Sequence, residues 1–162
     1  MRSFLTACCC LILCSCGNRD HWSHQKIHSN YEQFSYSKVI YQGHDPVRGV
    51  DIEFVESQEN VKTYLLVHSM PVPASKDTPK KIKVKMQIDD VLLTCEADRL
   101  EGGQRFLLPE AIALTLIEAF LTKKNVTITI PGYRSSIHSE GFIKHFRKMG
   151  RSFLENPFHL PF

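Results

Sequence analysis

The sequence predicts an α+β domain that is mainly antiparallel β, most simply a sandwich, with one main helix and a short C-terminal helix. Residues 81–88 alternate polar and apolar side chains without a break, which is the period of a strand. Other short runs rich in β-branched and aromatic residues are separated by turn-forming residues. One longer segment, after Pro109, repeats apolar residues at helical spacing. The chain has 162 residues, 43% of them hydrophobic and 23% charged, which is typical of one compact domain.

The expected strands are short and are joined mostly by turns. They fall at residues 37–42, 50–55, 61–68, 81–88, 91–95, 105–107 and 125–130. Asp89 and Asp90 are expected to form a tight turn, Gly102 and Gly103 another, and residues 71–79 are a loop by composition. The strand set is expected to end at Pro131.

Two helices are expected after the first six strands. Pro109 and Glu110 suit a first helical turn, because proline tolerates that position and glutamate favours the positive end of the helix dipole. Ile112, Leu116 and Phe120 then share one face. A shorter helix is expected to begin near residues 139–140 and to align three apolar side chains: Phe142, Phe146 and Met149.

Four segments follow from these patterns. Residues 1–15 are expected to be a lipoprotein signal peptide and residues 16–35 a lipidated polar tether without regular structure. Residues 36–150 form a single globular β-rich domain, and residues 151–162 form an apolar tail that either covers the core or docks into a partner. The net charge of +3 is well below that of a nucleic-acid-binding domain, so no nucleic-acid partner is expected.

The N-terminal segment carries the most specific motif. The apolar run from Phe4 to Cys14 follows the positive charge of Arg2. At about 1.5 Å per residue it spans half of the roughly 30 Å hydrocarbon core, too little for a stable transmembrane helix. Its end, Leu13-Cys14-Ser15-Cys16, resembles the lipobox of bacterial lipoprotein precursors, in which a leucine and two small residues precede the modified cysteine.

This resemblance implies cleavage between Ser15 and Cys16, a diacylglyceryl thioether on Cys16 and an N-acyl group on the new terminus. One acyl chain anchors a protein only marginally, whereas two or three anchor it stably. Gly17 and Asn18 follow the cysteine with no aspartate directly after it. By the same resemblance, the outer membrane is favoured over inner-membrane retention, and the membrane is a partner through Cys16.

The order of elements in the domain suggests a second resemblance. A helix, a Val-Thr-Ile-Thr-Ile strand and then Gly-Phe occur within Leu116 to Ile130 and at Gly141-Phe142. This arrangement loosely resembles small bacterial envelope proteins such as the invasion-associated locus B family. The resemblance assigns no functional residue.

Several groups of residues carry a candidate chemistry and a simpler structural explanation. Cys95 is the one cysteine outside the N-terminal segment, so it has no disulfide partner there. As a nucleophile it needs a histidine, and His68, His138 and His145 are the candidates. Its apolar strand neighbours favour core packing instead.

Three histidines of the expected tether, His21, His24 and His28, have a spacing that a metal site can use. No apolar face supports a helix there, so we expect neither a metal nor a cofactor. Asp89 and Asp90, with Glu96 and Asp98 near them in sequence, are candidates for acid–base catalysis. Adjacent acids between two strands more often hydrogen-bond the backbone of a turn, so we expect that role. The group Ser135, Ser136, His138 and Ser139 lacks a nucleophile elbow.

Two basic features are candidate anion-binding sites. One is the strand face that carries Lys81, Lys83 and Lys85; the other is the C-terminal helix, with Lys144, Arg147 and Lys148. Either can bind lipid head groups or an acidic protein of the envelope. The structural explanation is a solvated face, with lysines that protect a sheet edge.

These observations predict a lipid-anchored envelope lipoprotein that acts as a non-enzymatic binding or structural module. No sequence motif identifies the ligand. An envelope hydrolase with an unrecognised site is one alternative, and a surface-exposed lipoprotein that contacts host molecules is the other. A hydrolase requires that polar groups such as His68, Cys95 and His138 share a cleft.

Overall fold

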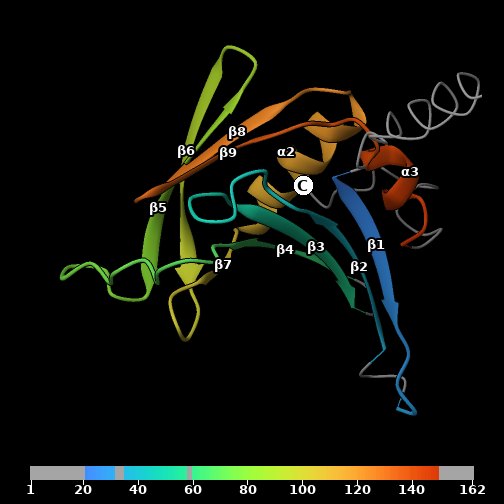
Figure 1. Cartoon of the computed structure of the whole chain (residues 1–162), viewed down its shortest axis with the longest axis horizontal. Helices are drawn as coiled ribbons and strands as arrows, with labels where there is room; N and C mark the ends of the chain where they lie inside the picture. Colours follow the sequence, from blue (N-terminus) through green and yellow to red (C-terminus); the bar gives the residue numbers. More distant parts are fainter. Residues whose placement is uncertain (1–20, 32–34, 58–59, 150–162) are drawn as a thin grey trace, which may run out of the picture.

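A computed structural model describes residues 21–31, 35–57 and 60–149. Within them the chain forms a predominantly antiparallel sheet with two helices, which confirms the predicted α+β class (Figure 1). The strands are β1 (Trp22–Ile27), β2 (Tyr36–Tyr41), β3 (Asp51–Ser57), β4 (Asn60–Leu66), β5 (Lys81–Ile88), β6 (Val91–Arg99), β7 (Arg105–Leu107), β8 (Val126–Ile130) and β9 (Tyr133–Ile137). The helices are α2 (Glu110–Leu121) and α3 (Phe142–Phe146).

The strands follow the order β1-β2-β3-β4-β7-β6-β5-β8-β9, and every neighbouring pair is antiparallel. The short strand β7 joins the two parts of this sheet. It pairs with β4 at three positions, but with β6 only through Asp98↔Leu107 and Arg99↔Phe106. The sheet therefore divides into β1–β4 with β7 and β6-β5-β8-β9, a sandwich-like arrangement.

Helix α2 fills the space inside the curved sheet (Figure 1). Its buried residues are Ala113, Leu116, Ile117, Ala119 and Phe120. Two of these, Leu116 and Phe120, lie on the face that the sequence predicts to be apolar, and the helix begins one residue after Pro109, which is its N-cap. The burial of this helix against the sheet supplies most of its stability, because isolated helices of this length are marginal in water.

The largest correction concerns the expected tether. Residues 22–27 form β1, which pairs along its whole length with β2, so the domain begins at least fourteen residues before position 36. Trp22 is only 1% exposed and meets the rings of Tyr41, Phe54, Phe120 and Phe142 at centroid distances of 4.8–6.1 Å. Strand β1 is polar because it lies at the edge of the sheet, where its last three residues are exposed to solvent.

The end of the domain also differs from expectation. The strand set does not stop at Pro131, because β9 follows Gly132 and pairs with β8. Strand β6 continues past residue 95 to Arg99, and its last residues pair with β5 through Ala97↔Ile82 and Asp98↔Lys81. Helix α3 is shorter than expected and begins at Phe142, after Gly141, whose φ of 85° ends the preceding turn.

Candidate functional site

A basic groove opens where the end of α2, the start of β8 and the start of α3 meet. Its volume is about 660 Å³. The polar residues that line it are Lys123, Asn125, His138, Ser139, Glu140, Lys144 and Arg147. Among the described residues of this lining, Glu140 is the one acid, so the groove has an excess of positive charge. Such a surface attracts anions such as phosphate or carboxylate groups.

Lys123 reaches the groove because of how α2 ends. The N–H of Lys123 bonds the carbonyl of Phe120 at 3.1 Å, and the N–H of Lys124 bonds that of Ala119 at 2.8 Å. These two bonds make a Schellman motif, in which the first residue beyond the cap adopts a left-handed conformation. Here that residue is Lys123, with φ of 61°. Glycine is the usual occupant because a Cβ costs about 1–2 kcal/mol in this region.

The opposite side of the groove is held by a polar side chain. The N–H of Ser139 donates to Oδ1 of Asn125 at 3.0 Å, which fixes the segment before α3 against the start of β8. Helix α3 then presents Lys144 and Arg147, and its buried Phe142 and Phe146 anchor it to the core. The sequence pattern predicts these two basic residues as an anion-binding site but gives no signal for Lys123 and Asn125. Their contribution depends on the loop conformation, which no local pattern predicts.

The predicted anion-binding residues therefore separate. Lys144 and Arg147 line the basic groove, whereas Lys148 is exposed farther along and is not part of the described lining. Lys81, Lys83 and Lys85 lie on the solvent face of β5, with Ile82, Val84 and Met86 buried between them. Figure 1 places β5 and α3 at opposite ends of the long axis, so the two basic features do not form one surface.

Acidic residues oppose the lysines of β5. In the β5–β6 register Lys81 faces Asp98 and Lys83 faces Glu96. The Nζ atom of Lys81 lies 3.9 Å from a carboxylate oxygen of each acid. These pairs are exposed and contribute little to stability, but they reduce the positive potential along this face.

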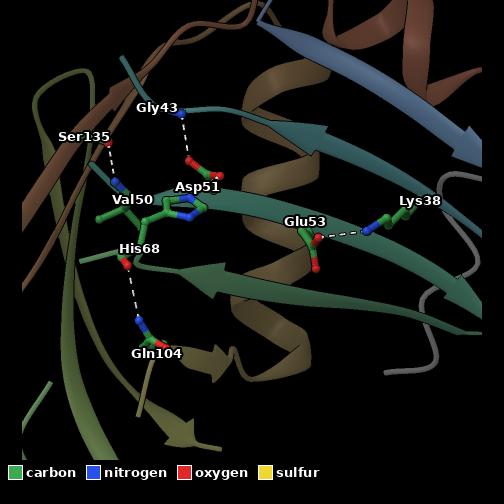
Figure 2. A network of polar contacts seen from close by, with 8 residues as sticks. All are labelled: Lys38, Gly43, Val50, Asp51, Glu53, His68, Gln104 and Ser135. Atoms are coloured by element: carbon green, nitrogen blue, oxygen red, sulfur yellow. Dashed lines mark hydrogen bonds and ion pairs between the residues drawn. The ribbon is translucent and has the colours of Figure 1, made fainter. Parts of the chain in front are cut away.

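A second polar cluster lies on β3 and around its start, at residues that sequence analysis did not single out as a group (Figure 2). Asp51 is 7% exposed; its Oδ1 accepts the N–H of Gly43 at 2.8 Å, and its Oδ2 lies 2.7 Å from Nε2 of His68. Ser135, on β9, accepts the N–H of Val50 at 2.6 Å. The cluster thus ties β9 and the loop after β4 to β3.

The Asp51–His68 pair has the appearance of half a hydrolytic triad, so its surroundings decide its role. Within the described part of the chain, no hydrogen bond joins the His68 ring to a serine or cysteine. The Ser135 hydroxyl is buried and accepts a backbone N–H. The contacts that the cluster makes in the described residues hold the loop before β3, the loop after β4 and strand β9 against β3.

Glu53, two residues along β3, is the centre of a charge network. It is 8% exposed, and its carboxylate oxygens lie 3.1 Å from Nζ of Lys38 and 3.0 Å from Nη2 of Arg105. The guanidinium of Arg105 also lies 3.9 Å above the ring of Tyr64. Figure 2 shows Glu53 on β3 with Lys38 reaching it from the neighbouring strand β2. A buried carboxylate with two cationic partners is a structural feature of the sheet.

Cys95 packs partly buried against the hydrophobic core, as predicted. Burial raises the pKa of its thiol, which lowers the fraction of reactive thiolate. The histidines proposed as its partners lie elsewhere: His68 pairs with Asp51, His138 lines the basic groove, and His145 is on α3.

The three N-terminal histidines separate along β1. His24 lies within the strand, His21 precedes it and His28 follows it. In the described residues no group of three or more His, Cys, Asp or Glu side chains is arranged to hold a metal ion. His21 instead contacts the ring of His44 at a centroid distance of 3.9 Å, and His44 lies 6.4 Å from His138.

His24 provides a test through pH. Burial, and then the positive charges of Lys148, His145 and Lys26, lower its pKa; its Nε2 also lies 2.8 Å from Oγ of Ser37. As pH falls below about 6.5, the unfolded chain takes up a proton that the folded chain resists, so stability falls. We expect the melting temperature of the wild type to fall more between pH 7.5 and 5.5 than that of His24→Gln. Equal losses in thermal melts of the two proteins would contradict the assignment.

The remaining acidic and serine candidates have structural positions. Asp89 and Asp90 form the two-residue turn between β5 and β6, as predicted, and Asp89 has φ of 50°. Ser135 and Ser136 lie on β9. The Oγ atom of Ser136 is 3.2 Å from Oγ1 of Thr127. The predicted cleavage and lipidation residues, Ser15 and Cys16, lie outside the described residues, as does the apolar tail at 151–162.

Comparison with protein-family models finds no match for this chain, and comparisons with curated proteins and with solved structures find none either. In the described part of the chain no helix is long and apolar enough to cross a membrane.

Proposed function

We propose that this chain is a bacterial lipoprotein, anchored to the outer membrane through Cys16, whose β-rich domain is a non-enzymatic binding module. The observation that carries the proposal is the motif Leu13-Cys14-Ser15-Cys16 at the end of a short apolar run. A run of that length fits a signal peptide better than a membrane-spanning helix. The cysteine at the cleavage junction distinguishes a lipoprotein from an ordinary secreted protein.

The arrangement of the domain supports a binding role over a catalytic one. Its conspicuous open feature is the basic groove, with Lys123, Lys144 and Arg147 in its lining. Its conspicuous titratable pair, Asp51 and His68, lacks a nucleophile in contact. Positive charge in a groove suits the recognition of an anionic group, and such recognition requires no proton transfer or covalent step.

Acylation tests the proposal directly. When the full-length gene product is made in bacteria supplied with labelled palmitate, we expect the wild-type protein to become labelled and Cys16→Ser to remain unlabelled. Mass spectrometry of the mature N terminus should find a peptide that begins at Cys16 and carries the mass of the lipid. A matched control is Cys14→Ser, which keeps a small residue at the neighbouring position and should retain the label.

Palmitate incorporation into Cys16→Ser, or a mature terminus at another residue, would show that the lipobox interpretation is wrong. Loss of label in Cys14→Ser alone would assign the modified residue to Cys14.

A further inference from the structure

The basic groove lies on the side of the domain where the polypeptide enters it. His138 lines the groove and lies 6.4 Å from the ring of His44. The ring of His44 lies 3.9 Å from that of His21, the first residue that the structure describes. Trp22, the next residue, donates its Nε1–H to the backbone carbonyl of His138 at 2.6 Å. The entry point of the chain and the groove are therefore adjacent.

The link between this entry point and the lipid attachment residue is short. His21 is five positions after Cys16 in the sequence. Fully extended, this segment spans at most about 18 Å. Because β1 begins at Trp22, the expected tether of twenty residues is not available to lift the domain away. The side of the domain that carries the groove is thus restricted to the neighbourhood of the bilayer surface.

Two basic side chains of the groove are exposed to solvent. Lys123 and Arg147 are exposed, and neither forms an ion pair with another described residue. The neighbouring Lys124 differs, since its Nζ lies 3.5 Å from a carboxylate oxygen of Asp89 and it does not line the groove.

Lys123 also occupies a backbone position that disfavours it. Its φ of 61° is a conformation in which glycine is the usual residue. Residues held in costly backbone conformations cluster at functional sites. In the groove that side chain adds a positive charge to those of α3.

We infer that the basic groove binds the phosphate groups of anionic phospholipids in the bilayer to which the chain is anchored. The inference rests on the proposed lipidation of Cys16, which sets the distance to the membrane. Lipid phosphates are the ligand because they form a dense anionic surface within reach of the groove. A basic side chain beside such a surface strengthens binding about fivefold. The groove would therefore fix the orientation of the domain on its membrane, with the opposite end, at β5 and β6, directed away from the membrane.

Vesicle binding tests this inference without any contribution from acyl chains. The protein is the mature chain, residues 16–162, carrying Cys16→Ser, and its fold is checked by circular dichroism and by Trp22 fluorescence. We expect it to co-sediment with vesicles of phosphatidylglycerol and phosphatidylethanolamine, and not with phosphatidylcholine alone. The double variant Lys123→Gln with Arg147→Gln should bind the anionic vesicles at least about tenfold more weakly.

The charge-matched control is Lys83→Gln with Lys85→Gln on β5, which removes the same charge from the other end of the molecule. It should change vesicle binding by less than about twofold if proximity to the groove matters. The single variant Lys123→Gly should bind about fivefold more weakly while its thermal midpoint stays equal or rises. This combination separates the loss of charge from a loss of fold.

Three results would overturn the inference. One is anionic-vesicle binding that is unchanged in the groove variant, and another is an equal loss in the β5 control. The third is release of the protein from vesicles by millimolar inorganic phosphate at constant ionic strength, which would indicate a site for a free phosphate compound.

A second experiment uses the lipidated protein and reports orientation. A photocrosslinking residue at Ile143, which lines the groove, should capture phospholipid in reconstituted vesicles, whereas one at the exposed Thr94 of β6 should not. Lipid capture at Thr94 and not at Ile143 would contradict the proposed orientation. The two proposals fail separately. Absence of acylation at Cys16 would contradict the proposed function, whereas the vesicle experiment uses an unlipidated chain and tests phospholipid binding by the groove alone.

Discussion

Replacing Trp22 with alanine is expected to lower the free energy of unfolding by about 3–5 kcal/mol. The indole is 1% exposed and contacts aromatic rings from β2, β3, α2 and α3. Its removal leaves a cavity that these rings cannot all fill, and it deletes the 2.6 Å hydrogen bond to the carbonyl of His138. The change is measured by guanidinium unfolding followed by far-ultraviolet circular dichroism. Tryptophan fluorescence cannot be used because the substitution removes Trp22, the one tryptophan of the chain.

The matched control is Gln25→Ala in the same strand. Gln25 is exposed, so its substitution should change stability by no more than about 0.5 kcal/mol. If Trp22→Ala lowers the free energy of unfolding no more than this control does, residue 22 does not belong to the core, and the prediction of an unstructured tether at residues 16–35 is correct.

Replacing Glu53 with alanine should destabilise the domain by about 2 kcal/mol. Glu53 is 8% exposed, and its carboxylate forms ion pairs with both Lys38 and Arg105. Loss of one partner from a fully buried ion pair costs about 3–5 kcal/mol. The expected loss here is smaller because 43% of the Arg105 side chain is exposed, and water screens the remaining charges. Urea unfolding at low and high salt gives the measurement.

Glu96→Ala provides the comparison, because it also removes a glutamate beside a lysine. Its carboxylate is 3.9 Å from Nζ of Lys81, and the Glu96 side chain is 60% exposed. The expected loss is within about 0.5 kcal/mol. Equal losses for Glu53→Ala and Glu96→Ala would mean that burial of the β3 network contributes nothing.

Sequence patterns predict the interior strands well and the edge strands poorly. Strand β5 has neighbours on both sides and buries every second residue, so its period of two is plain. The two missed strands, β1 and β9, are the two edges of the sheet. Edge strands carry polar residues that discourage pairing with other proteins, and this weakens the hydrophobic pattern that identifies a strand.

Strand β9 shows how one residue hides a strand. Its inward positions are Tyr133, Ser135 and Ile137, all buried. A serine among the inward residues breaks the apolar alternation, yet it fits because its hydroxyl accepts the N–H of Val50 from another part of the chain. Such a bond is set by the tertiary structure, so it leaves no signal in the local sequence.

The groove was predicted only in part, for a similar reason. Lys144, Arg147 and Lys148 lie close together in the sequence, so the sequence alone predicts a basic cluster there. Lys144 and Arg147 line the groove. Lys123 lies in a different part of the chain and reaches the site through the left-handed turn after α2. Charge clusters that several elements assemble need the fold before they can be recognised.

The junction at β7 has a consequence for how this molecule opens. Strands β1 to β4 form successive hairpins, each paired with its neighbour in sequence. Among the described residues, the two pairs between β6 and β7 are the ones that continue the hydrogen-bonded ladder into the other part of the sheet. Opening between β1–β4 with β7 and β6-β5-β8-β9 must therefore break these two ladder pairs and also the bonds that tie β9 to the first part, such as those from the N–H of Val50 to Ser135 and from the N–H of Arg134 to the carbonyl of Arg48. The two parts are expected to be the cooperative units of sub-global opening and hydrogen exchange. Helix α2 contributes Leu116, Ile117 and Phe120 to the hydrophobic core that residues of both units share, so opening between the units exposes these side chains.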